Sequence, residues 1–270
     1  MTFSIVARSA DGRSLGVAVA SKFLAVGAMV PAAGSGVGAL ATQAFANLAY
    51  RPQGLALLRT GVAAADVVAA LTTADPGRAH RQVGVVGPAG PGATYTGGEC
   101  MDWAGGVVGD GYAAQGNILA GPQVVEAIER AWLAGDPAAP LARRLYDALV
   151  AGDAAGGDRR GRQSAAVYVV SPGGGYGGTG DVAVDLRVDD HPDPVTELGR
   201  LLDVHALLFG RPDPATLLDL SGDLAAEVAD RLGTLGYASL DQWAGVENLE
   251  ERLVPGKIDP LVLDQLRRAG

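Results

Sequence analysis

The sequence has little cysteine, lysine or histidine, and each shortage narrows the chemistry that the protein can carry out. Cys100 is the only cysteine among 270 residues, so no disulfide can form within the chain. The three histidines, His80, His191 and His205, lack the spacing to further ligands that a structural zinc site requires. We therefore expect neither a metal nor a cofactor.

The chain also lacks long apolar runs and clusters of positive charge. No stretch of about 20 apolar residues occurs, so we expect no membrane span. The N-terminus does not show the basic and then apolar pattern of a secretory signal. The formal net charge is −9 and the only basic run is RRGR at 159–162, which argues against nucleic acid as a partner. These absences predict a cytoplasmic protein.

Glycine, in contrast, is abundant, with 40 residues that lie between short apolar segments and indicate many tight turns. Residues 3–8 and 15–19 follow a two-residue period around the turn signal DGR, which predicts a β-hairpin. Residues 163–170 and 182–188 predict a second hairpin around a glycine-rich loop. Further strands are expected at 27–31, 36–43, 82–86, 93–95 and 112–115.

Helices are predicted between these groups of strands, at 52–59, 63–73, 122–134, 140–151 and 194–208. Strands and helices come in blocks, which disfavours a doubly wound parallel sheet. Two mostly antiparallel sheets, each covered on its outside by a pair of helices, fit the order better. The predicted class is α+β, with the architecture of a four-layer α/β/β/α sandwich.

The segment FGRPDPAT at 209–216 is the best candidate for a domain boundary, because it holds two prolines and a glycine. It divides the chain into a sandwich domain, 1–208, and a small helical domain, 209–270. The second part is acidic, rich in leucine and too short to hold much core alone. We expect it to dock on the main domain or on another copy, which would make the protein a homo-oligomer.

Two glycine-rich stretches superficially resemble phosphate-binding loops. GSGVGA at 34–39 has the wrong glycine spacing for a dinucleotide loop and lacks the acidic residue about 20 positions downstream. PGGGYGGTG at 172–180 lacks the Lys-Ser/Thr pair of a P-loop. No G-x-S-x-G motif of an α/β-hydrolase occurs either. The sequence therefore favours turns over nucleotide sites in both places.

The N-terminus itself carries the first candidate for chemistry. A Met followed by a small residue such as Thr2 is normally trimmed, which would leave Thr2 with a free α-amine. That amine, with a pKa near 8, can act as a base for the hydroxyl of the same residue. No histidine is then needed. Most Met-Thr starts have no such role, so this motif needs support from other residues.

A second candidate lies in GGDRRGRQSAAVYVV at 156–170, where a turn leads into a buried strand. Asp158 and Ser164 could orient an N-terminal amine, and Arg159 or Arg162 could hold a substrate carboxylate with two hydrogen bonds. The alternative is a surface turn with a salt bridge.

A third candidate is YAAQGNILAGP at 112–122, where a predicted strand gives way to a helix. Asn117 and nearby backbone N–H groups could form an oxyanion hole, although Asn117 could equally cap the turn. We expect Gln115 to contact substrate, together with Gln43, which lies among small residues in ALATQAFAN at 39–47.

Lys22 stands out because the chain has only one other lysine, Lys257. The first hairpin would bring Ser21 and Lys22 to the end of the sheet where Thr2 begins. Lys22 could then favour ionisation of the Thr2 hydroxyl, and Ser21 could contact substrate. A lysine at the end of a hairpin can also simply be solvated. Cys100 is expected to be a small buried apolar residue, since no histidine activates it.

Several blocks of the sequence, in order, resemble one family. MTFSIVAR, LGVAVASKFLAVGAMVP, GVGALATQAFAN, DPGRAHRQVGVV, AAQGNILAGP and GGDRRGRQSAA are similar to the bacterial and archaeal family named domain of unknown function 1028. The resemblance runs from residue 1 to about 195. It implies an N-terminal nucleophile (Ntn) hydrolase fold, which is an α/β/β/α sandwich, and an amidohydrolase with Thr2 as nucleophile. The tail from about 200 to 270 resembles a helical segment that some members carry, labelled as peptidoglycan-binding.

Two features depart from better-known Ntn hydrolases. Proteasome-like members place their active-site lysine after a third strand, whereas Lys22 comes earlier. There is also no propeptide, so maturation would require only the removal of Met1. The resemblance names no substrate.

Three functions therefore stay open. The first is an amidohydrolase that cleaves the amide bond of a small molecule or peptide. The second is a binding module without catalytic activity, in which the C-terminal helices recognise cell-wall peptides or another protein. The third is a structural homo-oligomer in which those helices form the contact between copies.

Overall fold

The computed structural model describes residues 2–269, which form two compact units. The first unit ends at Leu202 and the second begins at Asp203, so the division falls inside helix α6 (Pro194–Phe209). The predicted boundary after residue 208 lies a few residues further along. Each unit has its own apolar core, and each is described separately below.

The larger sheet of the first unit, sheet A, has six strands in the order β10-β9-β2-β1-β8-β7, all antiparallel. Its strands are β1 (Thr2–Arg8), β2 (Leu15–Ser21), β7 (Gly105–Gly109), β8 (Tyr112–Asn117), β9 (Ser164–Val170) and β10 (Val182–Val188). Both predicted hairpins, β1–β2 and β9–β10, are present. The strand that begins at Thr2 therefore lies in the middle of sheet A, between β2 and β8.

The smaller sheet, sheet B, has four antiparallel strands in the order β3-β4-β5-β6. They are β3 (Pro31–Gly34), β4 (Gly38–Ala44), β5 (Arg81–Val86) and β6 (Ala93–Thr96). Strands β4 and β5 lie against β1, and β3 lies against β2 and β9. The two sheets thus pack face to face.

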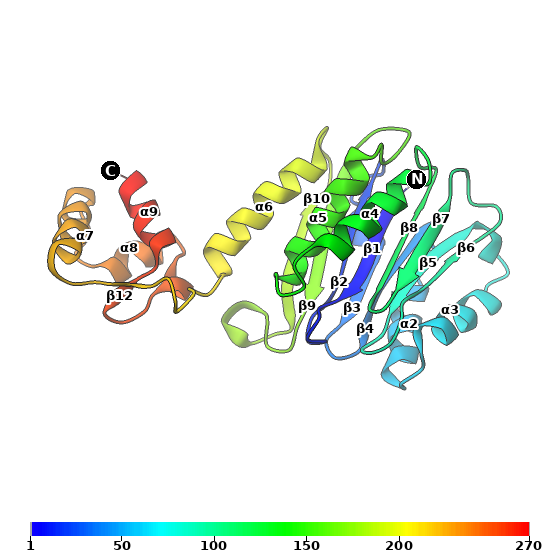
Figure 1. Cartoon of the computed structure of the whole chain (residues 1–270), viewed down its shortest axis with the longest axis horizontal. Helices are drawn as coiled ribbons and strands as arrows, with labels where there is room; N and C mark the ends of the chain where they lie inside the picture. The colour runs from blue at the N-terminus through cyan, green and yellow to red at the C-terminus, as the bar shows by residue number, and fades with distance from the viewer. Residues whose placement is uncertain (1, 270) are drawn as a thin grey trace. The chain divides into compact units, whose positions relative to one another are not determined.

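Alternation along the strands decides which side chains lie between the sheets. On β1, Phe3, Ile5 and Ala7 pack against α4 (Gln123–Ala134) and α5 (Leu141–Ala154), whereas Val6 faces sheet B. The outer face of sheet B is covered by α2 (Tyr50–Arg59) and α3 (Ala64–Thr73). Figure 1 shows α4 and α5 across the strands of sheet A and α2 and α3 beside sheet B.

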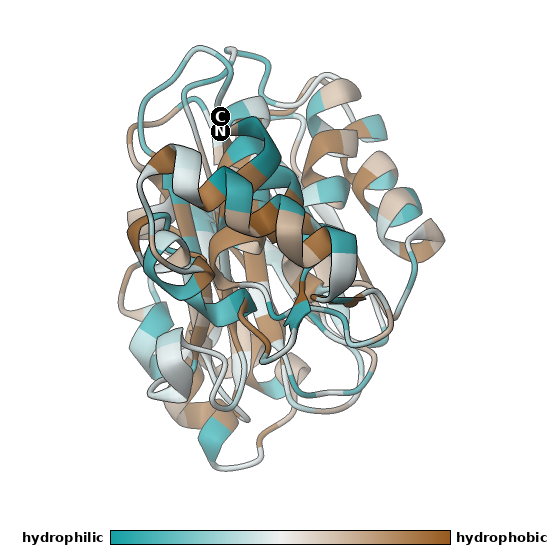
Figure 2. Ribbon diagram, turned by 90° about the vertical axis from the view of Figure 1, so that its left-hand side faces the viewer, coloured by the Kyte–Doolittle hydropathy of each residue, from teal (hydrophilic) through white to brown (hydrophobic). Residues whose placement is uncertain are grey.

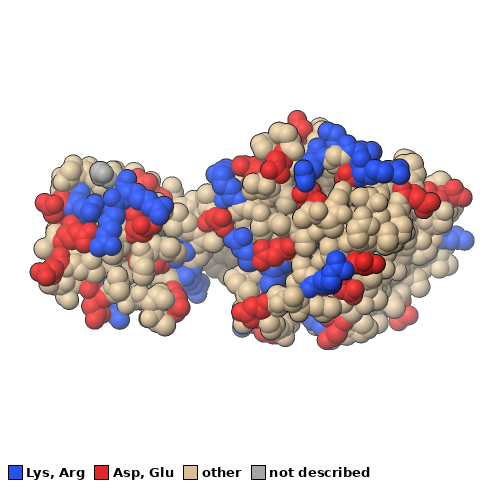
Figure 3. Space-filling view, turned by 45° about the horizontal axis from the view of Figure 1, so that its top comes forward, with Lys and Arg blue, Asp and Glu red and all other residues tan. Residues whose placement is uncertain are grey.

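The first unit is therefore a mixed α+β structure with antiparallel sheets, as the sequence predicted. The helices carry hydrophilic and hydrophobic residues together, as expected of elements with one face on a core (Figure 2). On the face shown in Figure 3, basic side chains lie in short groups next to acidic ones. Among residues 2–269, no helix is both long and apolar enough to cross a membrane.

Two local predictions were wrong. The strand expected at 27–31 begins only at Pro31, as β3, because Val26–Met29 forms the one-turn helix α1, whose Val26 N–H donates to the hydroxyl of Ser164 at 3.1 Å. This contact comes from a residue far away in the sequence. Strand β7 was missed, because its glycines hide the two-residue period; it pairs with β8 through Gly105–Gly109.

The second unit contains β11 (Leu218–Asp219), β12 (Lys257–Ile258) and the helices α7 (Gly222–Leu235), α8 (Leu240–Val246) and α9 (Pro260–Arg268). We expected little core here, but the unit has an apolar cluster around the fully buried Trp243. Arg252 forms a buried ion pair with Asp259 at 2.6 Å and donates to the carbonyl oxygens of Ala206 and Leu207. These contacts join the loop after α8 to the end of α6.

Candidate active site

At one end of sheet A, the terminal residues of four neighbouring strands are polar and form one row. Asn117 lies opposite Thr2, Thr2 lies opposite Ser21, and Ser21 lies opposite Ser164. These side chains point towards sheet B, because each lies two or four residues from an apolar residue of the same strand that faces sheet B: Ala113, Val6, Val17 and Ala166. The space between the sheets is therefore apolar at one end and polar at the other.

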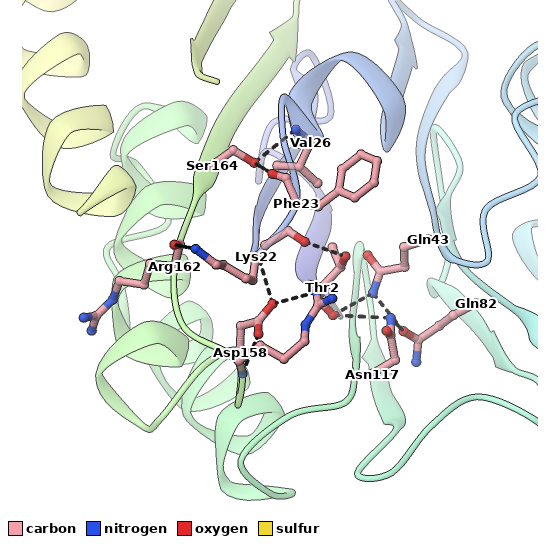
Figure 4. A network of polar contacts seen from close by, with 12 residues as sticks. Thr2, Lys22, Phe23, Val26, Gln43, Gln82, Asn117, Asp158, Arg162 and Ser164 are labelled. Atoms are coloured by element: carbon pink, nitrogen blue, oxygen red, sulfur yellow. Dashed lines mark hydrogen bonds and ion pairs between the residues drawn. The ribbon is translucent and has the colours of Figure 1, made fainter. Parts of the chain in front are cut away.

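Thr2 lies at the centre of this row and is 6% exposed. Its hydroxyl is 3.1 Å from the hydroxyl of Ser21, so the two oxygens share a hydrogen bond (Figure 4). The predicted removal of Met1 concerns a residue outside the described range. The Thr2 hydroxyl faces the space between the two sheets.

The main-chain carbonyl of Thr2 is held by two side-chain amides. Gln43 on β4 donates to it at 3.3 Å and Asn117 on β8 donates at 3.5 Å. The same two nitrogens donate to the side-chain oxygen of Gln82 on β5, at 2.8 Å and 2.9 Å respectively. Gln82 therefore connects the sheets at this point, as Figure 4 shows.

Sequence reasoning missed Gln82. Its amide nitrogen donates to the carbonyl oxygen of Gly116 at 2.8 Å and to the hydroxyl of Thr96 at 2.9 Å. The one available signal was a polar residue in the apolar run RQVGVV, two positions before Gly84 on the inward face of β5. A buried Gln in a strand needs hydrogen-bond partners from elsewhere in the fold, and it therefore marks a polar site.

The hydrogen-bond network continues along β1 to Ser4, two residues after Thr2. Its hydroxyl donates to Gln43 at 2.7 Å and accepts from the amide of Gln115 at 2.6 Å. The side-chain oxygen of Gln115 has no hydrogen-bond partner within residues 2–269. A Cβ atom at Gly84 would collide with the Gln115 side chain, so a glycine is required opposite it. Gln115 is fully buried and donates to Ser4. We had expected it to contact substrate.

Asp158 holds the strand end next to Thr2. Its carboxylate accepts from the backbone N–H of Lys22 at 2.7 Å and from that of Arg160 at 2.8 Å. The Arg160 guanidinium lies 3.3 Å from the same carboxylate, whose side chain is only 2% exposed. Because Lys22 directly follows Ser21, Asp158 fixes the residue that faces Thr2.

Other predicted residues surround the site but have different partners. Ser164 donates to the carbonyl oxygen of Phe23 at 2.5 Å and accepts from Val26, so it orders the segment after β2. The ammonium of Lys22 donates to the carbonyl oxygen of Arg162 at 3.2 Å. We had predicted that Ser164 orients the amine of Thr2 and that Lys22 favours ionisation of its hydroxyl. Within residues 2–269, the contacts described above for both side chains are with other residues.

The two arginines that we expected to bind substrate also differ from that expectation. Arg162 donates to both carboxylate oxygens of Asp153, at 2.8 Å and 3.0 Å. The side chain of Arg159 is exposed, and its backbone N–H donates to the carbonyl oxygen of Ile118. Arg160, which we did not single out, is instead the arginine that contacts Asp158. Sequence spacing could not distinguish the three.

A charged network orders the chain beyond Gln43. The carboxylate of Asp75 accepts from Arg81 at 2.9 Å, from Asn47 at 3.0 Å and from the hydroxyl of Tyr50 at 2.9 Å. Hydrogen bonds from Arg81 and then Asn47 hold the pKa of Asp75 well below its usual range, against the effect of burial. Burial and the bond to Asp75 raise the pKa of Tyr50. Arg81 also donates to Phe45 at 2.6 Å, so the segment 45–50 is tied to β5.

No group of three or more His, Cys, Asp or Glu side chains within residues 2–269 is arranged to hold a metal ion. Cys100 is half-buried, and burial raises the pKa of its thiol. The side chains that contact Thr2 are the hydroxyl of Ser21 and the amides of Gln43 and Asn117.

The fold and this site define an α+β protein with a polar site between two antiparallel sheets. Residues 2–198 match the model of a family described as "Family of unknown function (DUF1028)". The chain therefore belongs to the DUF1028 family, as its sequence blocks predicted. Residues 208–266 match a second model, described as "Putative peptidoglycan binding domain".

A solved structure supports the same assignment. The crystal structure of protein SPO2555 from Silicibacter pomeroyi, described as a DUF1028 protein, has 32% sequence identity to this chain and a TM-score of 0.68. The similarity covers 84% of this chain and 92% of that one. No curated protein matches the chain.

We predict that Gln82→Leu destabilises the first unit. The change leaves the buried amides of Gln43 and Asn117 without their shared acceptor, at a cost of about 1–3 kcal/mol for each unpaired group. Chemical denaturation of the full chain measures the free energy of unfolding. The exposed Gln53 supplies the control, since Gln53→Leu should change stability by less than about 0.5 kcal/mol. Equal effects of the two changes would contradict the role given to Gln82.

We predict that the stabilisation from Asp75 depends on pH. A carboxyl with a lowered pKa in the folded state contributes stability above its unfolded pKa, near 4, and loses it as the pH falls further. Asp75→Asn should therefore lower the free energy of unfolding at pH 7, and its difference from the wild type should shrink below about pH 4. Denaturation at a series of pH values tests this, with Asp66→Asn, at an exposed position of α3, as the control. A difference that does not change with pH would contradict it.

Proposed function

We propose that the protein is an amidohydrolase of the N-terminal-nucleophile type, with Thr2 as the nucleophile after removal of Met1. The observation that carries this proposal is the position of the Thr2 hydroxyl, at the end of a central strand and within 3.1 Å of Ser21. Two antiparallel sheets with helix pairs on their outer faces support the four-layer α/β/β/α assignment that this class requires. The resemblance of the sequence blocks supports it as well.

In the proposed reaction the free amine of Thr2 takes the proton of its own hydroxyl, directly or through a water molecule. The hydroxyl oxygen attacks the amide carbonyl carbon, and the tetrahedral intermediate collapses as the C–N bond breaks. The leaving amine receives the proton from the Thr2 ammonium, and water then hydrolyses the ester that remains on Thr2. Ser21 would keep the hydroxyl oriented, because the two oxygens are hydrogen-bonded.

The amides around Thr2 support a positioning role. Asn117 directs its nitrogen at Gln82 and at the Thr2 carbonyl, and Gln43 does the same. These bonds fix the peptide plane after Thr2 and therefore the direction of its side chain. We accordingly assign Asn117 to positioning and expect backbone N–H groups to stabilise the oxyanion. Asp158, which holds Lys22, would set the distance between the strand ends.

Arg160 is the best candidate to bind an acidic substrate. Its side chain is 44% exposed and its guanidinium lies 3.3 Å from Asp158, next to the backbone of Lys22. The Nε–H of Arg162 is shared between the two carboxylate oxygens of Asp153. A guanidinium at the strand end next to Ser21 suits a substrate that carries a carboxylate near the scissile amide, such as an N-acyl or N-carbamoyl amino acid.

A second candidate function concerns the C-terminal unit. Its match to a peptidoglycan-binding model over residues 208–266 supports binding of a cell-wall peptide. A cavity of about 250 Å³ inside this unit is lined by Trp243, Leu207 and Arg268 among others, and offers a place for one. Assembly into a homo-oligomer and a cytoplasmic location stay predictions.

We predict that Thr2→Ala abolishes hydrolysis. In a screen of N-acyl and N-carbamoyl compounds, activity should fall by at least about 10³-fold, because both the attacking oxygen and its proton are lost. Thr2→Ser keeps the hydroxyl and should retain measurable activity. Intact-mass measurement of the purified wild-type protein should show that Met1 is absent. A protein that keeps Met1, or a fully active Thr2→Ala variant, would refute the proposal.

We predict that Arg160→Gln selectively weakens the binding of acidic substrates. KM for a carboxylate-bearing amide should rise about tenfold with little change in kcat, because the lost bond is made before the reaction begins. Arg159→Gln is the matched control, since it removes the neighbouring exposed guanidinium. Equal increases of KM in both variants would show that Arg160 does not bind the substrate carboxylate. An equal increase of KM for the uncharged amide analogue would show the same.

A further inference from the structure

A groove lies beside sheet B because the two sheets differ in their number of strands. Sheet A has six strands and sheet B has four, and the outermost strand β3 of sheet B lies against β2 and β9. Sheet A therefore extends beyond sheet B on the side of β10. A cavity of about 610 Å³ lies there, between the inner face of β9 and β10 on one side and β3 and α2 on the other. This volume is typical of sites for small ligands.

The inner face of β9 and β10 supplies charged and polar groups to this groove. Tyr168 on β9 lies directly opposite Asp185 on β10, and Arg187 is 3.3 Å from Asp185. All three line the cavity. Burial and then Asp185 raise the pKa of Tyr168, while Arg51 acts in the opposite direction, so Arg51 lies within electrostatic reach of the same phenol.

Both arginines of the groove contact residues of α1. Arg51, from α2, donates to the carbonyl oxygen of Ala28 at 2.8 Å. The stem of Arg187 packs so closely on Gly27 that a Cβ atom there would lie 2.7 Å from its Cγ atom. Two arginines from different elements therefore line the cavity beside α1, and Arg187 also pairs with Asp185. A carboxylate is the ligand that such a pair recognises best.

The wall formed by β3 offers backbone groups of its own. Because Thr42 N–H donates to Val30 O, alternation directs the backbone groups of Val30 and Ala32 towards β4 and those of Ala33 away from it. The N–H and C=O of Ala33 thus point along the open edge of sheet B. An extended peptide can hydrogen-bond to such an edge.

We propose that this groove binds the C-terminal end of a short peptide. Arg51 and Arg187 receive the terminal carboxylate, the peptide backbone pairs with Ala33, and its side chains lie against Pro31 and Leu55. The groove is a separate site from Thr2. Three strand spacings separate β1 from β10, which places Arg187 roughly 14 Å across the sheet from Thr2. The proposal therefore does not depend on the proposed hydrolysis.

Isothermal titration calorimetry of the full chain with N-acetyl-trialanine, and with its C-terminal amide, tests the proposal. Titrations in the Thr2→Ala variant exclude hydrolysis of the probe. The free acid should bind, and the amide should bind at least tenfold more weakly because it lacks the carboxylate. Arg51→Gln and Arg187→Gln should each weaken the acid by at least tenfold. Arg59→Gln, at the exposed end of the same helix as Arg51, is the matched control and should bind normally.

A further variant protects the test against misfolding. Ala28 is exposed and lines the groove, so Ala28→Glu should fold normally and place a competing carboxylate beside Arg51. We expect it to abolish binding of the acid. Failure of the acid to bind, equal binding of acid and amide, or unchanged binding by Ala28→Glu would overturn the proposal. Binding to the wild type that is lost in Thr2→Ala would place the peptide at Thr2 and also overturn it.

Discussion

The site between the sheets depends on a single shared acceptor, the side-chain oxygen of Gln82. Amides buried between two sheets are stable only when each N–H finds a partner, and Gln82 accepts from both Gln43 and Asn117. Those two amides in turn hold the carbonyl of Thr2. The sheets are joined by apolar contacts at one end of their interface and by this network at the other. The direction of the Thr2 hydroxyl follows from it.

This arrangement separates neutral from charged groups. The interior of the site contains hydroxyls and amides, which can be buried at modest cost once they are paired. The carboxylates lie further out, where Asp158 binds backbone N–H groups and Asp75 binds Arg81. Each carboxylate orders a segment next to the site.

Much of the frame could be read from the sequence. The two hairpins, the paired helices and the place of Thr2 at the start of a strand follow from periodicity and turn residues, because these signals are local. The strand predicted at 27–31 is wrong for residues 27–29, which lie in helix α1, where the Val26 N–H donates to the distant Ser164. Arg160 could not be told from its neighbours, because only the path of the loop decides which arginine contacts Asp158.

The sequence by itself determined that Thr2 begins a core strand, that polar residues stand at the ends of several strands, and that the chain carries the blocks of the DUF1028 family. Tertiary structure decided which of those residues meet. Register across β8, β1, β2 and β9 aligns Asn117, Thr2, Ser21 and Ser164 in one row, and packing of the second sheet adds Gln82. The groove beside β10 likewise exists only because sheet A has more strands than sheet B. Both depend on contacts between residues far apart in the chain, which no local pattern encodes.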